Sequence, residues 1–170
     1  QAALGQATLY RAWAHFQMVQ LYGIRYSAGA ENTQPGIPIR LTADNDPLPR
    51  ASVEEVYAQI NTDLDAAIEL LDGYVRPNKS HLDQSVALGL KARVALVQQN
   101  YQVAADYAAQ ARANYNLMSN DDYYANFNTY TNGEWMWGSY IQEDQTDYYG
   151  NFGAYVSRNY SSTNIRTNPK

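Results

Sequence analysis

Apolar residues recur at helical spacing in four segments before residue 118, and the clearest of these segments is 52–72. Its apolar positions keep the i, i+3, i+4, i+7 spacing that gathers side chains on one face of an α-helix. Ser52 and Glu55 form a capping box, so the helix is expected to begin there. Its carboxylates are expected on the solvent side or at its borders, and we assign them no chemistry. The apolar positions are Val53, Val56, Tyr57, Ile60, Leu64, Ile68 and Leu71, and the acidic ones are Glu54, Asp63, Asp65 and Glu69.

Segment 4–22 predicts another helix, with a broad apolar surface and a narrow polar stripe. Gly23 is expected to end it. His15 lies on the stripe four residues after Arg11, and we interpret it as a structural or solvated histidine. The apolar surface comprises Leu4, Tyr10, Trp13, Ala14, Phe16, Val19 and Leu21, and the stripe comprises Thr8, Arg11 and His15.

Two further helices, 80–99 and 101–115, are separated only by residues around Asn100, so they must fold back on each other as a hairpin. A second capping box, Ser80 with Asp83, is expected to start the first helix. Asn100 suits the left-handed position that follows a helix end. Small residues predict the contact between the two helices, and they are Ala92, Ala95, Ala104, Ala108 and Ala111.

The spacing of small and aromatic residues in this hairpin agrees with a tetratricopeptide repeat, which is a helix-turn-helix unit of about 34 residues. The matching positions are Ala92, Tyr101, Ala104 and Ala111. The match is degenerate, because Lys91 stands where the repeat has Leu and Asn116 stands where it has Pro. Segments 4–22 and 52–72 would form a second such pair. We therefore expect an all-α fold of tetratricopeptide-like helical hairpins, stacked as a superhelical scaffold.

The chain divides into this scaffold, residues 1–118, and an aromatic-rich segment, residues 119–170, which is expected to belong to the same domain and to be truncated. The scaffold contains a long, proline-bearing connection at 24–51. Of the 22 aromatic residues, twelve lie between residues 121 and 160, interleaved with Asn, Gly, Ser, Thr and Asp. Regular core cannot bury every one of those rings, so some must lie at a surface. Composition alone leaves gap filling and ligand binding equally open.

Local patterns inside the aromatic-rich segment are weaker. Residues 119–122 are expected to cap a short helix, and 134–138 predicts a short strand or a buried turn. From residue 142 onward the chain is expected to be loop, with its densest aromatic patch at 148–155.

Composition and charge exclude several classes of protein. The formal net charge is −5, from 12 basic and 17 acidic residues, and there is no basic stripe, so a nucleic-acid partner is not expected. There is no cysteine, hence no disulfide framework and no thiolate metal site. No apolar run approaches the length of a transmembrane helix, and no signal peptide opens the chain. We expect the chain to be a fragment of a longer protein.

Motifs that carry chemistry are missing from the sequence. There is no phosphate-binding glycine loop, nucleophile elbow or zinc spacing, so we predict no cofactor, no metal and no catalytic residue. Segment 44–46, Asp-Asn-Asp, lacks the rest of a calcium loop and is interpreted as a polar turn. A glycosidase would need two carboxylates across a sugar site. The candidates for that lesser alternative are Glu143, Asp144 and Asp147.

Several stretches resemble the SusD/RagB family, the outer-membrane glycan-binding lipoproteins of nutrient uptake systems. Residues 11–16 and 21–23, Arg-Ala-Trp-Ala-His-Phe and Leu-Tyr-Gly, are similar to the family's early helix and its glycine stop. Residues 35–38 and 49–57 are similar to its proline loop and to the start of the next helix. The further matches are 60–71, the hairpin 87–97 with 101–111, and Glu-Trp-Met-Trp-Gly at 134–138.

The resemblance implies a tetratricopeptide-like scaffold that sits over a TonB-dependent (SusC-like) transporter and captures glycans through aromatic side chains on loops, without catalysis. It also implies a surface-exposed position on the outer membrane, through a lipid anchor that this chain does not contain. Members run to several hundred residues and carry a lipidated cysteine, which this chain lacks. The family's ligand contacts vary, so only the region after Trp137 is carried over.

Within that region we predict stacking platforms at four aromatic residues and hydroxyl partners at two polar ones. The platforms are Tyr148, Tyr149, Phe152 and Tyr155, and the polar partners are Asn151 and Asp147. Phe127, Trp135 and Trp137 are expected to pack the loop onto the scaffold instead. The alternative function is a helical-repeat protein-interaction module that binds no glycan. Neither reading names the glycan.

Overall fold

The computed structural model describes residues 1–125 and 129–140. The chain divides into two compact units, 1–138 and 139–170, and the first contains every helix described. The residues outside the described ranges include all six of the predicted ligand contacts. The helices are α1 (Ala2–Tyr22), α2 (Val53–Leu70), α3 (Gln84–Val97), α4 (Tyr101–Arg112) and α5 (Asn120–Ala125). The all-α class is confirmed, since the described ranges form no β-strand. The tetratricopeptide character stays a prediction.

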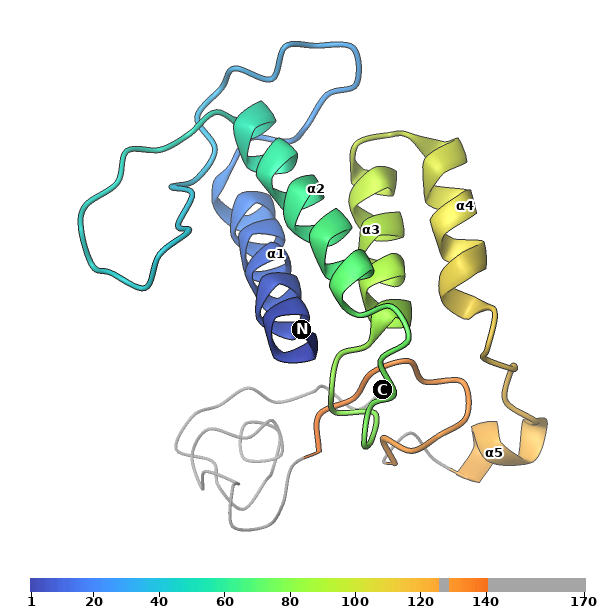
Figure 1. Ribbon diagram of the computed structural model, residues 1–170. Coiled ribbons are helices and arrows are strands. Elements are labelled where there is room, and N and C mark those ends of the chain that lie inside the picture. The colour runs from blue at the N-terminus through green and yellow to red at the C-terminus, as the bar shows by residue number, and fades with distance from the viewer. Residues whose placement is uncertain (126–128, 141–170) are drawn as a thin grey trace, which may run out of the picture. The chain divides into compact units, whose positions relative to one another are not determined.

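The first four helices form two antiparallel pairs that stand side by side (Figure 1). Helix α1 packs along α2, and α3 packs along α4. Contact between α2 and α3 joins the two pairs, so the core is continuous from α1 to α3. No helix in the described ranges is long and apolar enough to cross a bilayer.

Helix α2 forms where its sequence predicts it. Ser52 accepts a hydrogen bond from the Glu55 backbone N–H, and the Glu55 carboxylate accepts one from the Ser52 backbone N–H, which confirms the capping box. The expected position of Asp63 at the solvent border is wrong, because its side chain is 3% exposed. Arg11 of α1, which is partly exposed, donates two hydrogen bonds to that carboxylate at 2.8 and 2.6 Å, so the buried negative charge is paired.

Helix α1 also faces the core differently from its predicted orientation. The packed face is built around Leu9, Ala12, Phe16 and Val19, with His15 among them. His15 is therefore structural rather than solvated, and its Nε2 accepts the Arg40 backbone N–H at 3.2 Å. Most of the apolar surface predicted for this helix is instead exposed, namely Leu4, Tyr10, Trp13, Ala14 and Leu21.

The start of α3 and the turn before α4 also differ from expectation. Ser80 is not the cap of α3. Its backbone N–H and its hydroxyl both donate to the Asn78 side-chain oxygen, at 2.9 and 2.7 Å, and form a turn. Asp83 caps the helix instead and accepts from the Val86 N–H. The left-handed residue is Gln99, at φ +64°, while Asn100 is the N-cap of α4.

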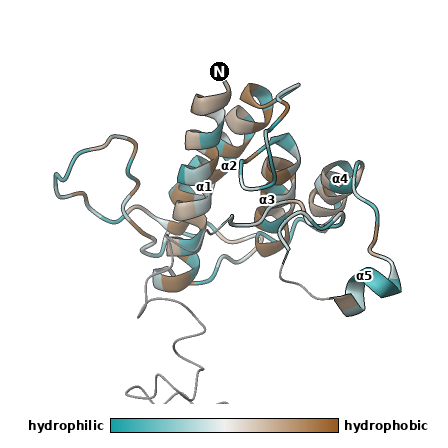
Figure 2. Cartoon of the chain, turned by 90° about the horizontal axis from the view of Figure 1, so that it is seen from below, coloured by the Kyte–Doolittle hydropathy of each residue, from teal (hydrophilic) through white to brown (hydrophobic). Residues whose placement is uncertain are grey.

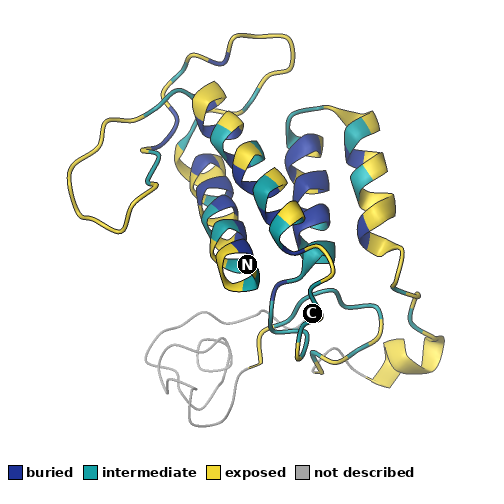
Figure 3. Cartoon of the chain, viewed as in Figure 1, coloured by how far each residue is buried: buried dark blue, intermediate teal, exposed yellow. Residues whose placement is uncertain are grey.

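The contact between α3 and α4 is made by small side chains, as predicted, with one exception. Ala92, Ala95, Ala104 and Ala111 are buried, whereas Ala108 is exposed. Figure 3 shows the consequence: α3 is largely buried, and α4 is exposed along most of its length. Lys91, the departure from the repeat pattern, is buried and pairs with Asp65 of α2 at 2.9 Å.

The long connection between α1 and α2 is tied together near both of its ends. The Gly36 N–H donates to the Ala51 carbonyl at 2.7 Å, and the Ala51 N–H returns a bond to Ile37 at 3.0 Å. Asn32 is buried and its backbone has a φ of +48°. Its side-chain amide accepts a hydrogen bond from the Ser27 N–H and donates one to the Ser27 carbonyl. Ile39 packs against the core, and residues 41–50 form an exposed lobe (Figure 1).

The polar turn predicted at 44–46 is organised by Arg40. Its guanidinium donates to the Asp44 carboxylate and carbonyl and to the Asp46 carbonyl. A cationic side chain therefore already occupies the group of oxygens that a metal ion would need.

Past α4 the chain is mostly irregular. Ser119 and Asp122 exchange side-chain bonds at the start of α5, as predicted, and α5 is largely hydrophilic (Figure 2). Segment 134–138 forms no strand but follows an irregular path with half-buried side chains.

Candidate functional site

Three aromatic rings from distant parts of the sequence meet at the surface of the first unit. Tyr10 and Trp13 lie three residues apart on α1, so both project from the side of the helix that α2 does not cover. Trp137 reaches them from the irregular segment after α5. We call this site the aromatic cleft. It contains none of the contacts predicted at 147–155, which lie outside the described residues.

Trp137 meets both α1 rings edge-on. Its ring centroid lies 6.3 Å from that of Tyr10 and 6.3 Å from that of Trp13, with interplanar angles of 69° and 83°. Such edge-to-face contacts are favourable, and they leave ring faces uncovered. Tyr10 is 44% exposed and Trp13 is 38% exposed, so the cleft presents aromatic surface to solvent. The packing role predicted for Trp137 is consistent with its contact to the core beneath.

The backbone around Trp137 is fixed by the loop that precedes α3. The Trp137 indole N–H donates to the Ser80 carbonyl at 3.3 Å, and the Gly138 N–H donates to the Lys79 carbonyl at 3.1 Å. The Lys79 ammonium points to the carbonyls of residues 131–133 and lies 5.9 Å from the Tyr115 ring centroid. Burial, together with the nearby Arg76 charge, lowers the pKa of Lys79.

A second ionic contact fixes the loop itself. Arg76 pairs with Asp83 at 2.9 Å and donates to the Tyr115 hydroxyl at 2.8 Å, and both members of the pair are mostly buried. Because Asp83 is also the cap of α3, one carboxylate positions the helix and the loop together. The orientation of Trp137 therefore depends on contacts from three segments.

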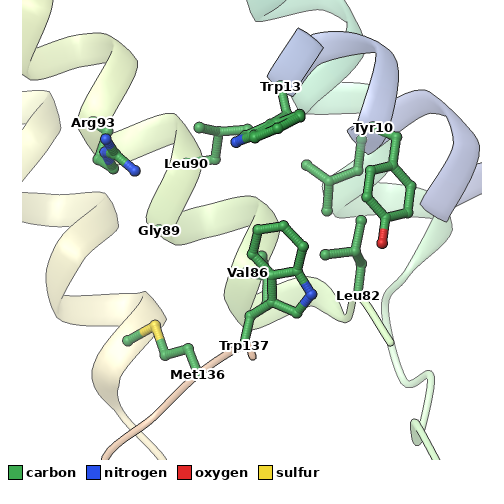
Figure 4. A pocket seen from close by; sticks show the side chains of 10 residues that line it. Tyr10, Trp13, Leu82, Val86, Gly89, Leu90, Arg93, Met136 and Trp137 are labelled. Atoms are coloured by element: carbon green, nitrogen blue, oxygen red, sulfur yellow. The ribbon is translucent and has the colours of Figure 1, made fainter. Parts of the chain in front are cut away.

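The cleft encloses about 320 Å³, at the low end of the range for small-ligand sites. Its floor is Gly89, where α3 has no side chain, and Figure 4 shows the rings on one side of that glycine with Arg93 on the other. A methyl group at Gly89 would meet only the Met136 sulfur and Ala111 at ordinary contact distance, 3.7 and 3.8 Å. The glycine thus widens the cleft and is not required by the helix packing.

Two more hollows lie nearby in the fold. A groove of about 480 Å³ runs between α3 and α4, and it shares Gly89, Arg93 and Met136 with the aromatic cleft. A third hollow, of about 590 Å³, lies at the end of α1 beside Tyr26 and Tyr101. The α3–α4 groove has a single ring, Tyr101, whereas the third hollow also has three, from Tyr26, Tyr57 and Tyr101. The cleft differs from both in that two of its rings are tryptophans.

Chemically, the described residues are equipped for binding. No group of three His, Asp or Glu side chains converges within 1–125 and 129–140. The buried His15 faces the 37–41 connection and does not line the cleft. Burial lowers the pKa of His15 and raises that of Tyr57 to about 12. These two groups lie in the core.

Sequence reasoning did not identify the cleft. It placed Tyr10 and Trp13 on a broad apolar surface of α1 together with Phe16 and Val19, and it placed Arg11 on the polar stripe. The available signal was the apolar spacing of Leu9, Ala12, Phe16 and Val19, which defines the buried face without any charged residue. That spacing leaves the two rings on the outside.

Comparison with known proteins gives a consistent result. Residues 1–96 match the family model SusD-like_3, described as starch-binding associating with outer membrane. A SusD-like carbohydrate-binding protein from Bacteroides vulgatus superposes with a TM-score of 0.71 and 33% identity, over 84% of this chain and 31% of that one. A SusD superfamily protein from Bacteroides thetaiotaomicron gives 0.60 and 26%, over 70% of this chain and 27% of that one. No curated protein matches the chain.

The chain therefore spans about a third of the length of these solved structures. The family match and the α1 to α3 core coincide, since residues 1–96 end within α3.

Proposed function

The chain belongs to the SusD-like family, and on that premise we propose that the protein binds oligosaccharide or polysaccharide nutrients at the outer membrane without catalysis. The observation that carries this proposal is the family match over residues 1–96, together with 33% identity to a SusD-like carbohydrate-binding protein. The aromatic cleft adds a surface of the right kind, because pyranose C–H faces stack on rings such as those of Trp13 and Trp137.

The residues predicted from sequence are proposed separately as ligand contacts. Tyr148, Tyr149, Phe152 and Tyr155 would stack on sugar rings, and Asn151 and Asp147 would pair with hydroxyls. Supporting this set are the density of rings and the glycine and asparagine residues between them.

Delivery completes the proposal. Bound glycan would pass to a TonB-dependent transporter, on which the protein sits at the cell surface through a lipid anchor outside this chain. This part is supported by the family resemblance and by the outer-membrane association in the family's description. Copurification of the intact protein with such a transporter tests it, and a failure to copurify in detergents that preserve known complexes would contradict it.

Calorimetric titration of the intact protein with a panel of oligosaccharides tests binding. Changing both Tyr148 and Tyr149 to Ala should lower affinity by about tenfold or more, since each ring contributes on the order of 1 kcal/mol. The matched control is Tyr22→Ala, which removes an exposed tyrosine from α1 away from the cleft. Unchanged affinity in the double variant would remove the two tyrosines from the site.

The helical-repeat alternative predicts a different outcome of the same measurements. If the intact protein binds the transporter while every glycan on a broad array stays unbound, the protein-interaction reading is correct. The apolar groove between α3 and α4 is the surface that this reading would use.

A further inference from the structure

The helices that form the walls of the aromatic cleft carry no acidic residue. Neither Ala2–Tyr22 nor Gln84–Val97 contains Asp or Glu, although acidic residues outnumber basic ones in the chain by 17 to 12. The two helices carry three cationic side chains, which are Arg11, Lys91 and Arg93. The electrostatic field in the cleft therefore depends on how those three are paired.

Two of the three cations are neutralised by α2. Arg11 pairs with Asp63 at 2.6 Å, and Lys91 pairs with Asp65 at 2.9 Å. Arg93 makes no ion pair or side-chain hydrogen bond with the described residues. Glu134, on the segment that carries Met136 and Trp137, accepts a hydrogen bond from the Met118 backbone N–H at 2.9 Å. Among the residues that the structure describes, Arg93 is thus the one of the three cations that has no ion pair.

Arg93 also has the right position to contact a bound molecule. It lies four residues after Gly89 on the same face of α3, so the missing side chain of Gly89 leaves open space between Arg93 and the rings (Figure 4). Arg93 lines both the cleft and the α3–α4 groove, at the point where the two share residues. A ligand on the ring faces would reach the guanidinium without entering the core.

We infer that the aromatic cleft binds a saccharide that carries an anionic group, with the sugar ring on Trp13 and Trp137 and the acid paired with Arg93. This inference rests on the proposed function and specifies its substrate class. A guanidinium binds carboxylate or sulfate oxygens through two parallel hydrogen bonds, which gives both energy and orientation. A neutral sugar gains the stacking contact alone, so the charge makes the cleft selective.

Calorimetry on the intact protein tests the inference with three probes. They are an oligogalacturonide, a sulfated galactan fragment and a neutral malto-oligosaccharide, the first two separating carboxylate from sulfate. We expect one of the anionic probes to bind at least about tenfold more tightly than the neutral one, with an affinity that falls as salt rises. Arg93→Gln should abolish that preference, and Arg93→Lys should restore part of it.

Two further variants distinguish the effect of the Arg93 charge from the effect of the shape of the cleft. Arg112→Gln removes an exposed cation from the last turn of α4, outside the cleft, and should leave all three affinities unchanged. Gly89→Leu should fill the floor of the cleft and weaken the anionic probe by about tenfold, while circular dichroism and the unfolding midpoint report that the helix is intact.

Each outcome has one meaning. Equal affinity for neutral and anionic probes, or a preference that survives Arg93→Gln, would overturn the inference and leave the carbohydrate function standing. Absence of binding to every probe, and to a broad glycan array, would overturn the proposed function as well. Anionic binding lost in Arg93→Gln but unaffected in Gly89→Leu would place the acid outside the cleft, and so would also contradict the inference.

Discussion

Helix α1 carries aromatic clusters on two of its sides, and the two differ in burial rather than in geometry. On the inner side Phe16 meets Tyr57 at 6.4 Å and 81°, and Tyr26 meets Tyr57 at 5.0 Å and 64°. On the outer side Tyr10 and Trp13 meet Trp137 in similar edge-on contacts. Phe16 is 1% exposed, whereas Trp13 is 38% exposed. Ring geometry alone therefore does not separate core from binding surface, and exposure does.

The largest expected effect is a difference in the loss of stability when one ring is removed from each cluster. Phe16→Ala should lower the free energy of unfolding by about 3–5 kcal/mol, because it leaves a cavity in a fully buried core. Trp13→Ala should cost roughly 1–2 kcal/mol, because solvent already reaches the ring. Urea denaturation of both variants measures the difference. Equal losses of unfolding free energy would mean that the outer cluster is part of the core, and would contradict its assignment as a binding surface.

The next effect concerns the ion pair that orients α1 between the two clusters. Asp63→Ala removes a buried carboxylate that Arg11 and Gln59 both contact, and should cost about 2–3 kcal/mol. The value is below that of a fully buried pair because Arg11 is 36% exposed and keeps access to water. Glu69→Ala is the matched control, since Glu69 is an exposed carboxylate on the same helix and its loss should cost less. Urea denaturation measures both losses, and a larger loss in Glu69→Ala would refute the assignment.

The smallest effect is a pH dependence from His15, beside the inner cluster. Burial lowers its folded pKa below the ordinary value of 6.5, so the unfolded chain binds a proton more readily. The stability that His15 contributes is therefore complete above pH 6.5 and falls as pH drops below that value, by on the order of 1 kcal/mol. His15→Gln keeps an acceptor for the Arg40 N–H and removes the titration. If wild type and variant lose equal stability between pH 7.5 and 5.5, His15 is not the cause.

Much of the fold follows from local sequence, and α2 shows why. Its capping box and its single apolar face lie within one continuous segment, so no distant residue is needed to place it. The polar stripe of α1 was misplaced although the spacing of its buried residues is local, because the carboxylate that pairs with Arg11 lies 52 residues away. The start of α3 was misplaced for a local reason: Ser80 bonds Asn78 and leaves the capping position to Asp83.

The candidate site was less predictable than the fold. The family resemblance implies ligand contacts in the loops after Trp137, and the contacts assigned there to six residues stay a prediction. The aromatic cleft depends on Trp137 docking against a helix more than a hundred residues earlier, through a bond to Ser80 that spans 57 residues. No periodicity in the sequence encodes such a contact. What the sequence does contain is the acid-free composition of the two helices that form the walls.

The backbone hydrogen bond between Gly36 and Ala51 affects how the sequence of the scaffold can evolve. Because those residues bond each other directly, the lobe between them enters and leaves the fold at nearly the same point. Doubling the length of such a closed loop costs only about 0.6 kcal/mol of chain entropy. Insertions and deletions at 42–49, between the anchored residues Arg40 and Arg50, should therefore change the free energy of folding little. This part of the lobe is where the scaffold can acquire new sequence most readily.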